Sequence, residues 1–187
     1  MSTDTLSTLF ALLSVLCAGA VVATLVVFVA AQFTSPDSVW GTLRDSLGDL
    51  SLWLAWLVAL TATVGSLYYS IGAHFSPCEL CWYQRICMYP LAVILLVGAL
   101  LQDRRVYWYA LPPAVVGLVI AIYHTQLQAF PKQKTFCDLN NPCTNRYIWK
   151  FGFVSIPLMD LVAFVFIITM VVVSATSSSR SEEVEPQ

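Results

Sequence analysis

The stretch Pro77–Arg85, PCELCWYQR, places two cysteines, Cys78 and Cys81, where a polar loop runs into an apolar helix. Two thiols at this spacing can close a disulfide or share a metal ion. A thiol at a helix N-terminus ionises more easily, because the unpaired backbone N–H groups there carry partial positive charge. Arg85 lies one turn after Cys81 on the same helix face, so we expect it to favour a thiolate at Cys81 and a negative oxygen on a bound ligand.

The composition around this stretch is that of an integral membrane protein. Of the 187 residues, 58% are hydrophobic and only 11% are charged, against roughly 25% charged in soluble domains. The net charge is −2, which gives no basis for a nucleic-acid partner. Four of the six cysteines fall in predicted polar loops, whereas Cys17 and Cys87 fall inside apolar segments, where we expect them to be packing residues.

Five apolar segments are long enough to cross a bilayer. The first is Leu6–Ala31, and the other four lie at about 50–73, 83–101, 106–127 and 153–174. A cleaved signal peptide is the competing interpretation of the first segment, but no Lys or Arg precedes it and it is longer than the usual signal-peptide core. The predicted fold class is therefore an all-α integral membrane protein: an antiparallel four-helix transmembrane bundle plus one additional N-terminal transmembrane helix.

The chain divides into three predicted parts: residues 1–49 with the additional helix and a connector, residues 50–176 with the four-helix core, and residues 177–187, a polar, acidic tail expected to be disordered. In the connector, apolar residues recur at steps of three and four: Trp40, Leu43, Leu47 and Leu50. We therefore expect an amphipathic helix there, beginning near Pro36 and Asp37 and lying along the membrane surface.

The order of the spans puts both cysteine-bearing loops on one side of the membrane. The loop 74–82 carries the first pair and the loop 129–152 carries Cys137 and Cys143, while the Arg-Arg turn at 102–105 falls on the other side. The positive-inside rule does not decide which side is cytoplasmic, because four basic residues stand against five. We place both pairs on the extracytoplasmic face of the cell membrane, since disulfides persist in oxidising compartments.

The second pair, Cys137 and Cys143, flanks the strong turn signal Asn140-Asn141-Pro142. A chain reversal there can bring the two Cα atoms within disulfide range. A bridge over so short a loop contributes roughly 2–2.5 kcal/mol in the chain-entropy model, which is ordinary for a structural disulfide. Energetics therefore does not separate a structural bridge from a redox pair. A loop that faces the first pair does suit thiol–disulfide exchange, which needs access from sulfur to sulfur.

Two motifs resemble the disulfide bond formation protein B (DsbB) family. One opens the third predicted span: Cys78-x-x-Cys81-x-Tyr83-x-Arg85. The other ends the next span and enters the long loop: His124-Thr-x-Leu127-Gln128, then Pro131 and Cys137-Asp138. The resemblance covers about residues 50–174 with the pieces in the family's order. The chain departs from the best-known members in its additional N-terminal span, and its closely spaced second pair is similar to that of the family's short-loop branch.

The resemblance implies a quinone-dependent thiol oxidase with four catalytic cysteines. A reduced, soluble thioredoxin-fold partner (DsbA-like) would attack the Cys137–Cys143 disulfide, with Cys137 the point of mixed-disulfide formation. Electrons would pass to the first pair, and Cys81 would deliver them to a membrane quinone, either ubiquinone or menaquinone. Arg85 would lie beside the quinone oxygen, and His124 would line the quinone pocket. This relay would support disulfide bond formation.

Two other functions stay open at this point. In a vitamin-K-epoxide-reductase-like quinone reductase, the loop pair would precede the Cys-x-x-Cys pair along the chain, the reverse of the order here. In a non-catalytic membrane protein, the loop cysteines would form structural bridges or a four-thiolate zinc site, from which their spacing is not far removed. We expect no bound metal. Asp160, just inside the last span, is either a functional carboxylate or the acidic residue of a helix's first turn.

Overall fold

The computed structural model describes residues 3–33, 39–133, 135, 137–138 and 141–184. Within these residues the fold has no strand, and five helices are long and apolar enough to cross a membrane. They are α1 (Thr3–Gln32), α2 (Val39–Leu67), α3 (Glu79–Leu101), α4 (Tyr107–Ala129) and α5 (Ile156–Val184). The predicted all-α membrane fold with five spans is confirmed.

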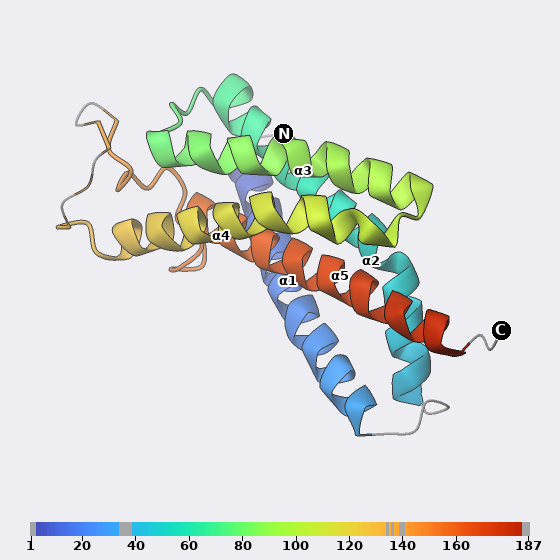
Figure 1. Ribbon diagram of the computed structural model, residues 1–187. Helices are drawn as coiled ribbons and strands as arrows, with labels where there is room; N and C mark the ends of the chain where they lie inside the picture. The colour runs from blue at the N-terminus through green and yellow to red at the C-terminus, as the bar shows by residue number, and fades with distance from the viewer. Residues whose placement is uncertain (1–2, 34–38, 134, 136, 139–140, 185–187) are drawn as a thin grey trace.

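The helices α2 to α5 form an antiparallel bundle, and α1 packs against α2 and α5 (Figure 1). The loop before α3 and the loop after α4 lie at one end of this bundle, and the turn between α3 and α4 lies at the opposite end. Both cysteine-bearing loops therefore share one end of the molecule, as strict alternation of the spans predicts.

Local sequence explains where α3 begins and ends. Cys78 precedes the helix in an extended conformation (φ −73°, ψ 172°), and Glu79 occupies the first turn, where the helix dipole favours an acid. At the other end Gln102 adopts a left-handed conformation (φ 50°) that stops the helix. The Asp103 carboxylate then accepts a hydrogen bond of 2.9 Å from the Arg105 backbone N–H. The chain reverses tightly here, so α3 and α4 lie antiparallel.

The bundle core depends on close helix approach. Phe164 of α5 is completely buried, and a Cβ atom placed on Gly117 of α4 would lie 2.3 Å from its ring. Only glycine leaves room for this contact. Leu91 and Leu95 of α3 are also completely buried. Since lipid is as apolar as these side chains, such tight van der Waals packing is what holds membrane helices together.

Two expectations about the ends of the chain are corrected. Residues 39–67 form one continuous helix, so the apolar residues of the connector belong to the first turns of α2 and not to a separate surface helix. No proline interrupts this stretch, so the backbone hydrogen bonds continue. The expected start at Pro36 and Asp37 lies outside the described residues. Likewise, α5 runs to Val184 over most of the tail that was expected to be disordered, and residues 185–187 are not described.

Candidate redox site

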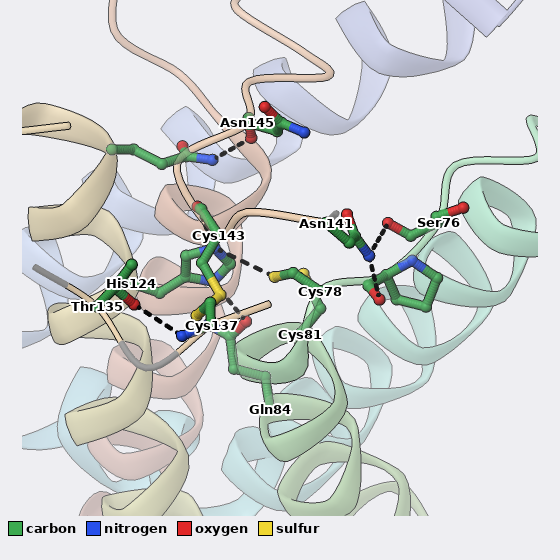
Figure 2. Close-up of a disulfide and its surroundings, with 12 residues drawn as sticks. Ser76, Cys78, Cys81, Gln84, His124, Thr135, Cys137, Asn141, Cys143 and Asn145 are labelled. Carbon is green, nitrogen blue, oxygen red and sulfur yellow. Dashed lines mark hydrogen bonds between the residues drawn. A yellow bond between two sulfur atoms is a disulfide. The ribbon is translucent and has the colours of Figure 1, made fainter. Parts of the chain in front are cut away.

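The fold brings the two cysteine pairs together (Figure 2). Cys137 and Cys143 form a disulfide whose Cα atoms are 6.0 Å apart. Cys78 and Cys81 are free thiols whose sulfur atoms lie 3.0 Å apart. Three of these residues, Cys78, Cys137 and Cys143, are buried in one apolar cluster with Leu127 of α4. The arrangement gives the contact between pairs that thiol–disulfide exchange requires.

His124 joins the two pairs (Figure 2). Its side chain is only 1% exposed, and its Nε2 atom lies 3.7 Å from the Cys78 sulfur and 3.2 Å from the backbone oxygen of Cys143. A carbonyl oxygen can only accept, so Nε2 carries a proton and donates it to Cys143. On the other side of the ring, Nδ1 lies 3.2 Å from the Gln84 side-chain oxygen. His124 thus fixes the loop disulfide against Cys78.

The reduced first pair has its thiolate at Cys78. The pKa of Cys78 is lowered to about 4, chiefly by the hydrogen bond with Cys81 and further by the hydrogen bond and charge of His124, while burial opposes the shift. We had expected Cys81, with help from Arg85, to carry the negative charge. The structure differs because His124 lies beside Cys78 and because Arg85 binds elsewhere.

Arg85 connects α3 to the end of α2. Its Nε atom donates to the Ser66 hydroxyl at 2.8 Å, and Nη2 donates to the Ser66 carbonyl at 3.0 Å and to the Ser70 hydroxyl. The guanidinium carbon also lies 5.2 Å from the centre of the Trp82 ring. Ser70 belongs to a single π-helical turn, Tyr68–Gly72, a distortion that is frequent at functional sites.

A cavity of about 380 Å³ lies between α1, α2 and α5 and reaches Cys81 and Arg85. This volume is within the roughly 300–1,000 Å³ that is usual for ligand pockets. Most of its wall is apolar, and Asp160 of α5 also lines it. Cys78 and His124 are not among the lining residues, so the structure places His124 between the cysteine pairs and outside this cavity. The first pair therefore spans two environments: Cys78 faces the loop disulfide, and Cys81 faces the cavity.

Side-chain amides hold the long loop in place. The Asn141 amide nitrogen donates to the backbone oxygens of Pro77 at 3.0 Å and Ser76 at 3.4 Å, next to the first cysteine pair (Figure 2). Gln128, at the end of α4, donates to the backbone oxygen of Asn145 at 2.9 Å. These bonds tie the segment that carries the disulfide to the starts and ends of two membrane helices.

Sequence reasoning missed two parts of this site. Gln84 was not singled out, although an amide three residues after Cys81 in an otherwise apolar helix is a signal of a buried polar contact. Asn141 was interpreted only as a turn residue. Its contacts with the loop before α3 depend on two segments more than sixty positions apart, which no local pattern reports.

The zinc alternative loses two of its four ligands. Cys137 and Cys143 are bonded to each other and therefore offer no thiolate to a metal. Among the described residues, Cys78, Cys81 and His124 still form a group whose potential ligand atoms all lie within 4.8 Å of one another. A closed structural zinc site takes four protein ligands, so this group is incomplete as such a site.

Taken together, a bundle of membrane-spanning helices and two cysteine pairs in contact at one end define a membrane thiol–disulfide oxidoreductase. A family model described as disulfide bond formation protein DsbB matches residues 49–174. The chain belongs to the DsbB family. The match leaves α1 outside it.

Curated relatives are similar over the same core. Disulfide bond formation protein C of Bacillus subtilis (strain 168) is 47% identical over 119 residues, which are 63% of this chain and 86% of the relative. Probable disulfide formation protein C 2 of Bacillus cereus (strain ATCC 10987 / NRS 248) is 38% identical over 128 residues, 68% of this chain and 92% of the relative. A probable disulfide formation protein of Coxiella burnetii (strain CbuK_Q154) is 42% identical over 120 residues, 63% of this chain and 82% of the relative. No solved structure matches the chain.

Proposed function

We propose that the protein is a thiol:quinone oxidoreductase that reoxidises a soluble, thioredoxin-like dithiol partner and passes the electrons to a membrane quinone, and so supports disulfide bond formation. The observation that supports this most is the position of the first pair. Cys78 lies against His124 and the loop disulfide, and Cys81 lines a cavity between membrane helices. Electrons can enter the pair at one sulfur and leave it at the other.

In the first step, a thiolate of the reduced partner attacks the loop disulfide. We assign the attacked sulfur to Cys137, which is 6% exposed, whereas Cys143 is 1% exposed and held through its carbonyl by His124. The Cys137–Cys143 bond breaks, a mixed disulfide forms at Cys137, and Cys143 leaves as a thiolate. The partner's second thiol then displaces Cys137. The partner is oxidised by two electrons, and the loop pair is reduced by two electrons and takes up two protons.

In the second step, the reduced loop pair reduces a disulfide between Cys78 and Cys81. The Cys143 thiolate attacks Cys78, which is buried in the same apolar cluster as Cys143, and Cys81 leaves. Cys137 then attacks Cys143, restores the loop disulfide and releases Cys78. The low pKa of Cys78 makes it a good leaving group here, because thiols of lower pKa leave faster. His124 lies beside the Cys78 sulfur and the Cys143 carbonyl oxygen, so it is placed to donate to the negative charge that forms on Cys78.

The cavity fits a quinone as the final acceptor. A bound quinone would supply two-electron chemistry: it would accept two electrons from the first pair together with two protons, so that the Cys78–Cys81 disulfide could form again. Apolar walls suit its ring, and Cys81 opens onto the same space. Arg85 uses Nε and Nη2 to bind Ser66 and Ser70, so its charge is held at the cavity wall, and its Nη1 atom is not used in these bonds. The Nη1 group of Arg85 would donate to a carbonyl oxygen of the quinone and stabilise negative charge on that oxygen.

We place the cysteine end of the bundle on the extracytoplasmic face of the cell membrane. The proposed reaction makes disulfides, and disulfides persist in oxidising compartments. A soluble dithiol partner on that face would reach the loop pair without crossing the bilayer. Labelling of Cys137 and Cys143 in intact cells by a membrane-impermeant thiol reagent after mild reduction tests this orientation. Labelling only after the membrane is broken would contradict it.

Turnover of purified protein with a reduced thioredoxin-like dithiol protein and a soluble quinone tests the proposed reaction. We expect Cys81→Ser to abolish quinone reduction. The matched control is Cys87→Ala, which removes a buried thiol of the same helix that lies in the bundle core. Unchanged turnover of Cys81→Ser would rule the mechanism out. The partner itself is identified by Cys143→Ser, in which Cys137 is a free thiol. The Cys137 thiolate attacks the disulfide of the oxidised partner, one partner cysteine leaves as a thiolate, and the mixed disulfide at Cys137 accumulates because no Cys143 thiol is present to resolve it.

A further inference from the structure

Helix α1 lies outside the family match and yet lines the cavity that Cys81 reaches. The residues of α1 that face this cavity recur at positions i, i+3, i+4 and i+7: Phe10, Leu13, Ser14 and Cys17. This spacing is one continuous stripe of a helix. The side of α1 away from this stripe carries Leu12 and Leu16, which are exposed on the surface of the protein. One face of α1 therefore looks into the cavity and the other looks toward lipid.

The end of α1 near the cysteine pairs is held by specific contacts. Phe10 packs on Gly65 of α2, where a Cβ atom would lie 3.2 Å from the Phe10 ring. The Phe10 ring also meets Tyr69 edge-on at 5.8 Å, and the Tyr69 hydroxyl lies 3.4 Å from the Ser7 hydroxyl. An ion pair between Asp4 and Lys150 adds a contact with the long loop. These contacts hold the first half of α1 in a defined position against α2 and the long loop, so α1 forms a wall of the site.

An aromatic ladder continues from α1 to the loop that carries the disulfide. Beyond the Phe10–Tyr69 pair, Tyr69 stacks on Phe75 at 5.9 Å, and Phe75 stacks on Tyr147 at 4.9 Å. All four rings line the cavity. They form an aromatic part of its wall between α1 and the long loop. With α1 absent, the stripe that completes this enclosure would be missing, and the groove between α2 and α5 would open to lipid.

We infer that α1 completes the binding chamber for the quinone ring and that Ser14 and Cys17 contact the bound quinone. This inference rests on the proposed function, in which a quinone is the acceptor. The chamber combines apolar walls with a polar end made by Arg85, Asp160 and the reactive sulfur of Cys81. A lipid acyl chain has no group to bind at that end, whereas a quinone carries an oxygen on an apolar ring. The chemistry of the wall therefore favours a quinone over a hydrocarbon tail.

Photolabelling of the unaltered chain tests the inference directly. The probe is an azido-substituted benzoquinone with a decyl tail, and the product is read by mass spectrometry of the peptides. We expect labels on the α1 residues Phe10–Cys17 that an excess of the unsubstituted decyl benzoquinone removes. Labels confined to other helices would overturn the inference. A second, binding-only measurement uses a full-length variant in which Cys17 is the single thiol: the same decyl benzoquinone should slow alkylation of Cys17 at least fivefold.

A matched pair of variants tests whether α1 shapes the site. Ser14→Trp introduces a large ring into the chamber. Leu16→Trp places the same ring on the side of α1 that points away from the chamber, where Leu16 is 68% exposed. We expect Ser14→Trp to lower competable photolabelling and to raise the KM for quinone at least tenfold. Its rate of reduction by the dithiol partner should stay unchanged, which also shows that the variant is folded. Leu16→Trp should match the unaltered chain in all three measurements.

The outcomes separate this inference from the proposed function. If the unaltered chain reduces quinone but α1 is not labelled, Cys17 is not protected and Ser14→Trp has a normal KM, the role of α1 is wrong while the reaction stands. If the unaltered chain does not reduce quinone at all, the proposed function fails first, and the inference that rests on it fails with it. Protection of Cys17 by a saturated decyl alcohol as strongly as by the quinone would show a lipid-binding groove and would also overturn the inference.

Discussion

The Nε2 atom of His124 lies 3.7 Å from the sulfur of Cys78, although the two residues stand 46 positions apart in the chain. The same nitrogen lies 3.2 Å from the Cys143 carbonyl oxygen. One buried imidazole thus contacts a sulfur of the first pair and the backbone of the second, so its position holds the two pairs against each other.

Replacing this imidazole should raise the pKa of Cys78. In His124→Ala the thiolate loses a hydrogen bond and a favourable charge, and only the side-chain and backbone hydrogen bonds with Cys81 remain to lower the pKa. We expect the pH profile for alkylation of the reduced protein to move toward higher pH and exchange between the two pairs to slow by roughly tenfold or more, since proton handling contributes about 10²–10⁴ in such steps. Stopped-flow alkylation between pH 4 and 9 measures the profile. His74→Asn, a change at the exposed second histidine, should leave both properties unaltered.

The reduction potential of the first pair should show the same thiolate. Below pH 4, reduction of the Cys78–Cys81 disulfide takes up two protons with two electrons, so the potential should fall by about 60 mV per pH unit. Above the lowered pKa of about 4, Cys78 stays ionised and reduction takes up one proton. The slope should then be about 30 mV per pH unit. Equilibration with glutathione between pH 5 and 8 measures it. A slope near 60 mV over that range would show that Cys78 is protonated.

Arg85→Gln should impair the acceptor side of the site alone. The substitution removes the charge at the cavity wall together with the bonds to Ser66 and Ser70. We expect the KM for quinone to rise about tenfold, the loss of roughly one charge-assisted hydrogen bond. The rate of reduction by the dithiol partner should be normal. Arg44→Gln, at the other end of the bundle where Arg44 stacks on Phe28, is the matched control. An equal loss in both half-reactions would instead indicate a structural role.

Asn141→Ala should loosen the loop that carries the disulfide. The amide of Asn141 bonds two backbone oxygens beside the first cysteine pair, and each such bond is worth about 1 kcal/mol. We expect dithiothreitol to reduce Cys137–Cys143 about tenfold faster, because the loop opens more readily. Hydrogen exchange of residues 137–147 should increase in parallel. Asn145→Ala, which removes an exposed side chain of the same loop, should change neither measurement.

Zinc should act as an inhibitor of the reduced protein and not as a component of the active one. Cys78, Cys81 and His124 offer three ligand atoms within 4.8 Å of one another, enough to capture added Zn²⁺ when both thiols are free. We expect micromolar Zn²⁺ to block turnover and a chelator to restore it, while the chelator alone leaves the activity of untreated protein unchanged. His124→Ala should weaken the inhibition. Stoichiometric zinc in active, purified protein, removed together with activity, would favour the metal-site alternative.

Much of the architecture was determined by the sequence alone. Membrane spans are visible in a sequence because a helix that crosses lipid needs about twenty apolar residues in a row, as in Leu6–Ala31. Counting the spans was then enough to put both cysteine pairs at one end. The turn signal between Cys137 and Cys143 was enough to make a disulfide possible but left a zinc site open, and the motifs at Cys78 and His124 were enough to find the family.

Only the tertiary structure decided which atoms of the site meet. It put the thiolate at Cys78 and not at Cys81, because His124 of α4 reaches Cys78 and Arg85 binds Ser66 of α2 and Ser70 of the π-helical turn that follows it. It also turned α1 from an unexplained additional span into a wall of the cavity. Hydropathy carries no such information, because every face of a membrane helix is apolar. Which face meets a neighbour depends on steric fit between helices, and that fit exists only once the bundle has assembled.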